Sequence, residues 1–107
     1  MADPSDRRAS ERLPAGADAA CSFVSPVVED FGPARIKNVS LEGIGLIVTR
    51  KVESGALLAL TLANAARGFS KTVLVRVMHV TPQPGGFLVG GSFSAPLTYQ
   101  ELTTLVL

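Results

Sequence analysis

Residues 70–80 have the sequence SKTVLVRVMHV, and this stretch decides the fold class. Successive side chains of a β-strand point to opposite faces, so Val73, Val75 and Val77 share one face. Leu74 and Met78 share the other face. Both faces are therefore mainly apolar, which is typical of a strand in a closed barrel or of a strand between covering elements.

Similar apolar runs lie on both sides of this stretch. They are rich in Val, Ile, Leu and Thr and are separated by Gly, Pro and Asn, a pattern of short strands joined by turns. The predicted strands cover residues 19–28, 33–40, 45–49, 57–63, 71–81 and 86–94. The clearest turn signal is the sequence PQPGG at 82–86. Because no strand–helix–strand alternation is visible, we expect an all-β fold, a six-stranded antiparallel β-barrel.

A short C-terminal helix completes the expected fold. Thr98 and Glu101 have the spacing of a capping box, which predicts a helix that begins near Thr98. Leu102, Leu105 and Val106 then form an apolar stripe that would pack on an open end of the barrel.

The chain has 107 residues, enough for one domain with a hydrophobic core. Residues 1–16 contain Pro4, Pro14, Gly16 and a high density of charge, a composition that predicts a flexible arm. We therefore expect the arm at 1–16 and the barrel domain at 17–107.

Several classes of function are disfavoured by composition. The formal net charge is only +1, too little for a field that holds nucleic acid or an anionic membrane. No apolar run reaches about 20 residues and no secretion signal is visible, so we expect a cytoplasmic protein without membrane insertion. Cys21 and His79 are the single cysteine and histidine, and the acidic residues form no convincing catalytic pair. We expect neither an enzyme nor a metal or cofactor site, and we assign His79 a structural role.

Three arginines, Arg7, Arg8 and Arg12, lie within six positions of the arm. A guanidinium group is planar and permanently charged, and it can bind phosphate oxygens or guanine O6 and N7 bidentately or stack on a base. An arm that folds over an anionic ligand could therefore present several such groups to it. The alternative is a solvated basic terminus without a ligand.

A second motif, Asn38-Val39-Ser40-Leu41-Glu42-Gly43, follows the second predicted strand. Asn38 could recognise the edge of a base, Ser40 could donate to a phosphate, and Gly43 could let backbone N–H groups approach an anion. The alternative is an Asx or Ser turn with a glycine at positive φ, which needs no ligand.

The two motifs in this order, RRxxxR followed by [D/N]xSxxG, resemble those of the PilZ family, small β-barrels that bind the bacterial second messenger cyclic di-GMP. The segment GFLVGGSF at 86–93 is similar to a later strand of that family. The resemblance covers about residues 7–105. It implies a six-stranded PilZ-like barrel with a short C-terminal helix.

The resemblance also implies roles for individual residues. Arg8 and Arg12 would clasp the bases and phosphates of cyclic di-GMP, and Arg7 would support a stacked ligand pair. Asn38, Ser40 and Gly43 would form the barrel side of the pocket. Two positions depart from the usual pattern, because Asn38 stands where many members have Asp and Glu11 places a carboxylate inside the arginine motif.

The expected function is that of a cyclic di-GMP receptor or adaptor whose arm orders around the ligand and alters a surface for a protein partner. The chain would be a monomer or a weak homodimer. One alternative is a degenerate PilZ-like interaction module that does not bind cyclic di-GMP. Another is a small barrel that binds nucleic acid or a different anion, which the near-neutral charge and the lack of Trp disfavour.

Overall fold

The computed structural model describes residues 11–24 and 34–107. The elements are β1 (Leu13–Pro14), β2 (Ala19–Phe23), β3 (Ala34–Val39), β4 (Gly43–Val48), β5 (Leu57–Asn64), the 3-10 turn η1 (Ala65–Arg67), β6 (Phe69–Gln83), β7 (Gly86–Phe93) and α2 (Tyr99–Val106). Arg7, Arg8 and the parts of two predicted strands at 25–28 and 33 lie outside the described residues.

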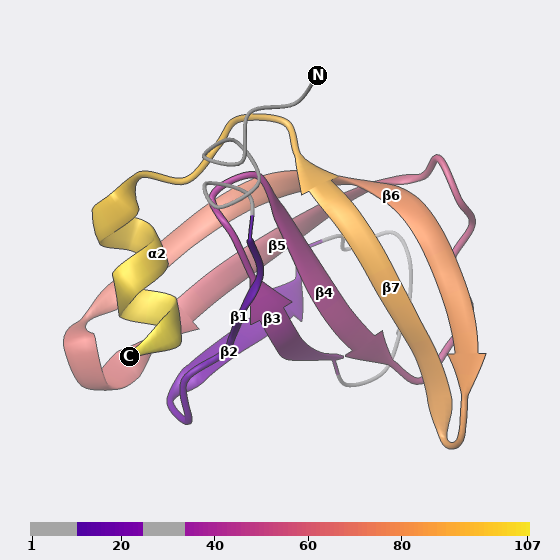
Figure 1. The fold of residues 1–107 in the computed structure, drawn as a ribbon, viewed down its shortest axis with the longest axis horizontal. Coiled ribbons are helices and arrows are strands. Elements are labelled where there is room, and N and C mark those ends of the chain that lie inside the picture. The colour runs from indigo at the N-terminus through magenta and orange to yellow at the C-terminus, as the bar shows by residue number, and fades with distance from the viewer. Residues whose placement is uncertain (1–10, 25–33) are drawn as a thin grey trace.

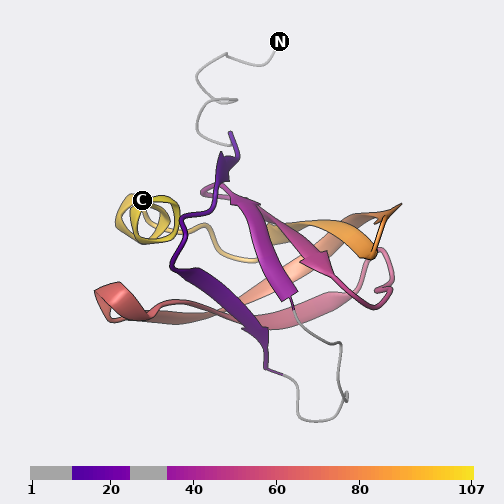
Figure 2. The same ribbon diagram turned by 90° about the horizontal axis from the view of Figure 1, so that it is seen from below.

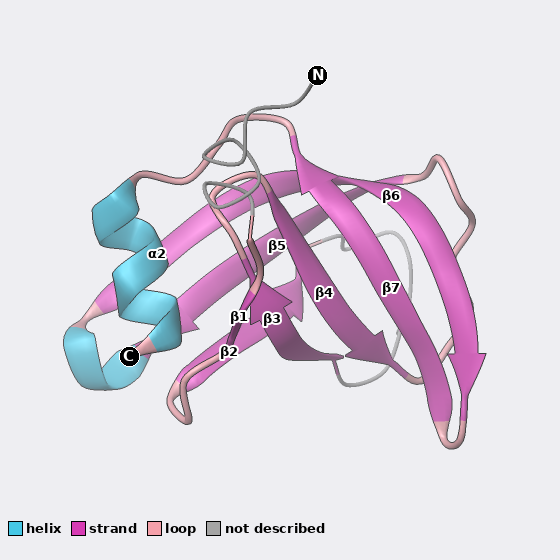
Figure 3. Ribbon diagram, in the orientation of Figure 1, coloured by secondary structure: helices cyan, strands magenta, loops and turns pink. Residues whose placement is uncertain are grey.

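The all-β prediction is confirmed, with the short C-terminal helix in place (Figure 3). The strands form one antiparallel sheet in the order β1-β3-β4-β7-β6-β5-β2. The sheet curls into a half-barrel whose two edges are β1 and β2 (Figures 1 and 2).

The sheet has seven strands rather than the predicted six, and the additional strand is β1. It consists of two residues at the end of the predicted arm, where Leu13 pairs with Val39 and Pro14 with Asn38. Two residues are too few to show an alternating pattern, so this strand could not be recognised from the sequence.

The concave side of the sheet holds the hydrophobic core. Alternate residues of β4, β5, β6 and β7 are buried there: Ile44, Leu46, Val48, Leu58, Leu60, Leu62, Val73, Val75, Val77, Val89 and Phe93. The opposite face of β6 is exposed, with Leu74 at 46% and Met78 at 57% of their full exposure. Its apolar residues therefore do not mark a strand that is covered on both sides.

Helix α2 packs at one end of the curled sheet (Figure 1). The predicted capping box is confirmed: Thr98 Oγ1 accepts from the N–H of Glu101 at 3.1 Å, and the N–H of Thr98 donates to Glu101 Oε1 at 2.8 Å. Leu102 and Leu105 are buried, and Val106 is partly buried against the core. Thus the helix begins and packs as its sequence predicts.

Two β-bulges shift the alternation of the strands. One lies between Ile36 and Asn38 in β3, and the other lies between Val77 and His79 in β6. A bulge places an additional residue on one strand and redirects the side chains that follow it. In β6, His79 is consequently exposed although the regular alternation predicted it on the face of Val77.

Candidate binding site on the outer face of the sheet

Four residues form a row across β3, β4, β7 and β6 on the outer face of the sheet. Asn38 pairs with Gly45, Gly45 pairs with Gly90, and Gly90 pairs with His79. Directly paired residues of antiparallel strands point to the same side. The row therefore has a side chain at each end and two glycines in the middle.

A neighbouring row begins at Gly43, which pairs with Ser92, and Ser92 pairs with Arg76. A Cβ atom on Gly43 would lie 2.6 Å from the carbonyl oxygen of Gly91, closer than real Cβ contacts allow. Gly43 does not have a positive φ, so the close approach of β7 rather than the turn conformation requires glycine here. Together, Gly43, Gly45 and Gly90 form what we call the glycine floor.

Arg12, the residue before β1, lies over this floor. Its Nη2 atom donates to the carbonyl oxygen of Gly91 at 3.3 Å, and it lies 3.0 Å from the position of a Cβ on Gly43. Its Nη1 atom lies 3.5 Å from the position of a Cβ on Gly45. The pairing of Leu13 with Val39 fixes the chain beside Arg12 to the sheet. One of the predicted site residues is thereby held at the motif that contains Asn38 and Gly43.

Among the described residues, no carboxylate forms an ion pair with the guanidinium of Arg12. The ion pair in this part of the chain joins Lys71 and Glu101. Partial burial lowers the pKa of Arg12, but a guanidinium remains protonated in proteins at neutral pH. The adjacent Glu11 does not neutralise it in the described structure. Arg12 therefore brings a positive charge to the glycine floor that no carboxylate of the described residues pairs with.

Asn38 lies at the edge of the same floor. Its Oδ1 atom is buried and accepts no hydrogen bond from the described residues, and it occupies the space that a Cβ on Gly45 would need. A buried acceptor without a donor costs about 1–3 kcal/mol, and a ligand N–H group would recover that free energy once the Asn38 amide turned outward to meet it. Arg12 and Asn38 thus place donors and an unused acceptor over one glycine.

Ser40, by contrast, is committed to the turn between β3 and β4. It is 2% exposed, and its Oγ accepts from the N–H of Gly43 at 3.0 Å and from the N–H of Glu42 at 3.3 Å. The hydroxyl donates to the carbonyl oxygen of Gly43 at 3.3 Å. A hydroxyl has one donor and two acceptor positions, and all of them are used here. Ser40 shapes the turn and offers no hydrogen bond to a ligand.

The described structure therefore brings together Arg12, Asn38 and Gly43 and keeps the hydroxyl of Ser40 apart from them. Sequence reasoning did not select Gly45, Gly90 or His79 for the site. Gly45 follows Gly43 at the two-residue spacing of one strand face, and glycine inside a strand often marks a close approach. That signal was present for Gly45, whereas the position of His79 depends on the bulge in β6.

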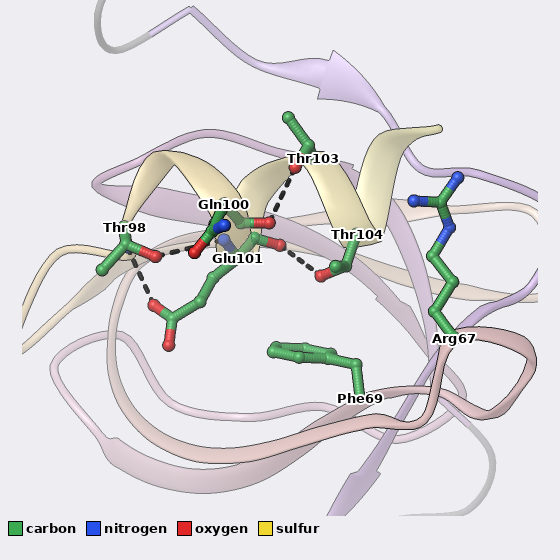
Figure 4. Close-up of a pocket in the computed structure, with 7 residues that line it drawn as sticks. All are labelled: Arg67, Phe69, Thr98, Gln100, Glu101, Thr103 and Thr104. Carbon is green, nitrogen blue, oxygen red and sulfur yellow. Dashed lines mark hydrogen bonds between the residues drawn. The ribbon is translucent and has the colours of Figure 1, made fainter.

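A hollow lies between α2 and the start of β6, with a volume of about 600 Å³ (Figure 4). It is lined by Arg67, Phe69, Thr98, Gln100, Glu101, Thr103 and Thr104. The three threonine hydroxyls are already hydrogen-bonded within the helix and its cap, and Glu101 is paired with Lys71. Arg67 is the one charged side chain of this lining without an ion-pair partner among the described residues, and the threonine hydroxyls beside it are already used. The outer face of the sheet is therefore the better candidate for binding an anion.

The described residues contain no cluster of His, Cys, Asp and Glu that could hold a metal ion. The same part of the chain has no helix long and apolar enough to cross a membrane. Comparisons with protein-family models, curated proteins and solved structures gave no match for this chain.

Proposed function

We propose that this protein is a cytoplasmic cyclic di-GMP receptor of the PilZ kind. The observation that carries the proposal is the meeting of Arg12 and Asn38 over the glycine floor, where, among the described residues, the guanidinium has no carboxylate partner and the amide oxygen accepts no hydrogen bond. Both residues belong to the two motifs that resemble those of the PilZ family. The anionic charge and the base edges of the ligand match these groups.

The chemistry of the ligand explains the pairing. Cyclic di-GMP has phosphates and guanine O6 and N7 atoms, which accept hydrogen bonds from a guanidinium. Its guanines also have N–H groups, which suit the free Oδ1 of Asn38. Because Gly43 and Gly45 have no side chains, Arg12 and Asn38 lie close to the sheet, and in this proposal the ligand binds to these two side chains from outside. By the resemblance to the PilZ family, Arg8 would also clasp the ligand and Arg7 would support a stacked ligand pair; both lie outside the described residues.

The proposal includes an adaptor function in which ligand binding changes a surface for a protein partner. The segment after Arg12 leads directly to α2, because the N–H of Gly16 donates to the carbonyl oxygen of Leu105 at 2.8 Å. A ligand that repositions Arg12 would therefore act on a segment attached to the helix. The partner would recognise the helix end and the ordered arm.

Isothermal titration calorimetry with cyclic di-GMP tests the proposal, with GTP and cyclic di-AMP as control ligands at two temperatures. We expect saturable binding of cyclic di-GMP alone, at one or two ligands per chain. Arg12→Ala should weaken binding at least tenfold, while the matched variant Arg67→Ala, in the hollow beside α2, should bind like the wild type. The absence of heat at hundreds of micromolar ligand at both temperatures would reject the proposal.

A second candidate is a PilZ-like interaction module that does not bind cyclic di-GMP. It is favoured by three exposed apolar residues on β5 and β6, namely Leu57 at 54%, Leu74 at 46% and Met78 at 57% exposure. If this candidate is right, the wild type should self-associate in sedimentation experiments and Leu74→Ser should reduce that association. A ligand-silent wild type that remains monomeric at all concentrations would argue against self-association as well.

A further inference from the structure

His79 lies opposite Arg12 and Asn38 across the glycine floor. It is the second of two consecutive outward residues at the bulge in β6 and pairs with Gly90. A Cβ on Gly90 would overlap the Cε1 and Nε2 atoms of His79 and lie 3.0 Å from its Nδ1. The imidazole ring therefore lies over Gly90, in the place of the missing side chain.

The remainder of the His79 side chain is open. The residue is exposed, and neither of its ring nitrogens makes a hydrogen bond to another described residue. The ring nitrogens therefore have no hydrogen-bond partner among the described residues. An aliphatic side chain could cover the backbone of Gly90 equally well, so packing on Gly90 does not by itself require an aromatic ring.

The pairing of the strands sets the distance across the floor. Side chains of directly paired residues in an antiparallel sheet start about 4.5–5.5 Å apart. Asn38 lies over Gly45 and His79 lies over Gly90, and these glycines are direct partners. A base bound by the Asn38 amide and Arg12 would therefore lie beside the imidazole.

We propose that His79 is the second wall of the ligand site, where its ring stacks against a purine base bound by Arg12 and Asn38. This inference rests on the proposed function and adds a recognition residue outside the two sequence motifs. The bulge in β6 exposes the ring, and the ring can lie against the backbone of β7 because Gly90 has no side chain. The bulge in β3, on the other side of the floor, directs Asn38 in the same way.

The test is the affinity for cyclic di-GMP of the wild type and three variants of the full chain. Loss of base stacking on a ring weakens binding by about 5- to 150-fold, so His79→Ala should fall in this range. His79→Phe keeps an aromatic face and should stay within about threefold of the wild type. The matched control is Met78→Ala, the other outward residue at the bulge, which should bind like the wild type.

A double-mutant cycle with Gly90→Ala tests whether the ring of His79 acts from its position over Gly90. The added methyl group would displace the imidazole, so Gly90→Ala should weaken binding in the presence of His79. In the His79→Ala background the same substitution should have a clearly smaller effect, since the ring is already absent. Additive losses would show that His79 does not act from this position and would overturn the proposal.

The outcomes separate the two proposals. If the wild type binds and His79→Ala binds equally well, or His79→Phe is as weak as His79→Ala, the stacking role fails while the receptor function stands. If the wild type does not bind cyclic di-GMP, the receptor function fails and the role of His79 fails with it. Melting temperatures of the His79 and Met78 variants should match the wild type within a few degrees, because both residues are exposed.

Discussion

Gly16 donates its backbone N–H to the carbonyl oxygen of Leu105 at 2.8 Å, and this bond joins the segment before β2 to the last turn of α2. A Cβ on Gly16 would lie 2.7 Å from the backbone oxygen of Leu107. Gly16→Ala should therefore push the segment away from the helix and lower the free energy of unfolding by about 1–2 kcal/mol. Chemical denaturation measures the change.

The control for this prediction is Ala17→Ser, a substitution at the next, exposed residue. It should change the free energy of unfolding by less than about 0.5 kcal/mol. Equal stability of Gly16→Ala and the wild type would mean that the contact between this segment and α2 contributes nothing to the fold.

Ser40→Ala should reduce stability, although the sequence motif suggested a direct role in binding. The substitution removes the acceptor for the N–H groups of Glu42 and Gly43, and the N–H of Gly43 is buried. Loss of partners for buried donors costs about 1–3 kcal/mol. Urea unfolding of Ser40→Ala should show this loss, while Ser92→Ala, an exposed serine on β7, should not. An unchanged midpoint for Ser40→Ala would contradict the assignment of Ser40 to the turn.

The ion pair between Lys71 and Glu101 predicts a pH dependence. The hydrogen bond from Lys71 Nζ, at 2.9 Å to Oε2, and then the hydrogen bond from the backbone of Thr98 lower the pKa of Glu101. The carboxylate is therefore favoured in the folded state, so its stabilisation is present above the unfolded pKa of about 4.3 and is lost as the pH falls further.

Glu101→Gln isolates this effect, because glutamine also completes a capping box but forms no ion pair. The wild type should be more stable by about 0.2–1 kcal/mol at pH 7 and low salt, since the pair is partly exposed. The difference should begin to decrease as the pH falls below about 4.3 and should be lost as the pH falls through the lowered pKa of Glu101 in the folded protein; it should also shrink in high salt. A difference that is constant from pH 7 to pH 3 would show that the carboxylate charge is not its source.

Cys21 should react slowly with iodoacetamide. It is partly buried against the core, and burial raises the pKa of its thiol to about 11. Because only the thiolate reacts, alkylation at pH 8 should be about 100-fold slower in the folded protein than in urea, where the pKa is about 8.5. Mass spectrometry follows the reaction. Equal rates in both conditions would mean that β2 opens readily at the edge of the sheet.

Much of the fold could be predicted from local patterns. The alternation of Val73, Val75 and Val77 and the spacing of Thr98 and Glu101 both depend on neighbours along the chain, and both predictions were confirmed. The two-residue strand β1 could not be predicted, because its pairing depends on β3 rather than on its own sequence.

The candidate site depends on features that alternation does not contain. The motifs predicted a site at Asn38 and Gly43, but the bulges in β3 and β6 decide which side chains border the glycine floor. The use of the Ser40 hydroxyl within its own turn is likewise visible only in three dimensions. Sequence alone located the motif but not the contacts of its members.

The three glycines of the glycine floor are constrained for two different reasons, folding and ligand binding. A side chain at Gly43 meets the backbone of β7, whereas side chains at Gly45 and Gly90 meet the movable ends of Asn38 and His79. A library selected only for folded protein should therefore reject replacements at Gly43 and accept small ones at the other two positions. Selection for ligand binding should reject replacements at all three, so comparison of the two libraries would map the binding surface without a ligand-bound structure.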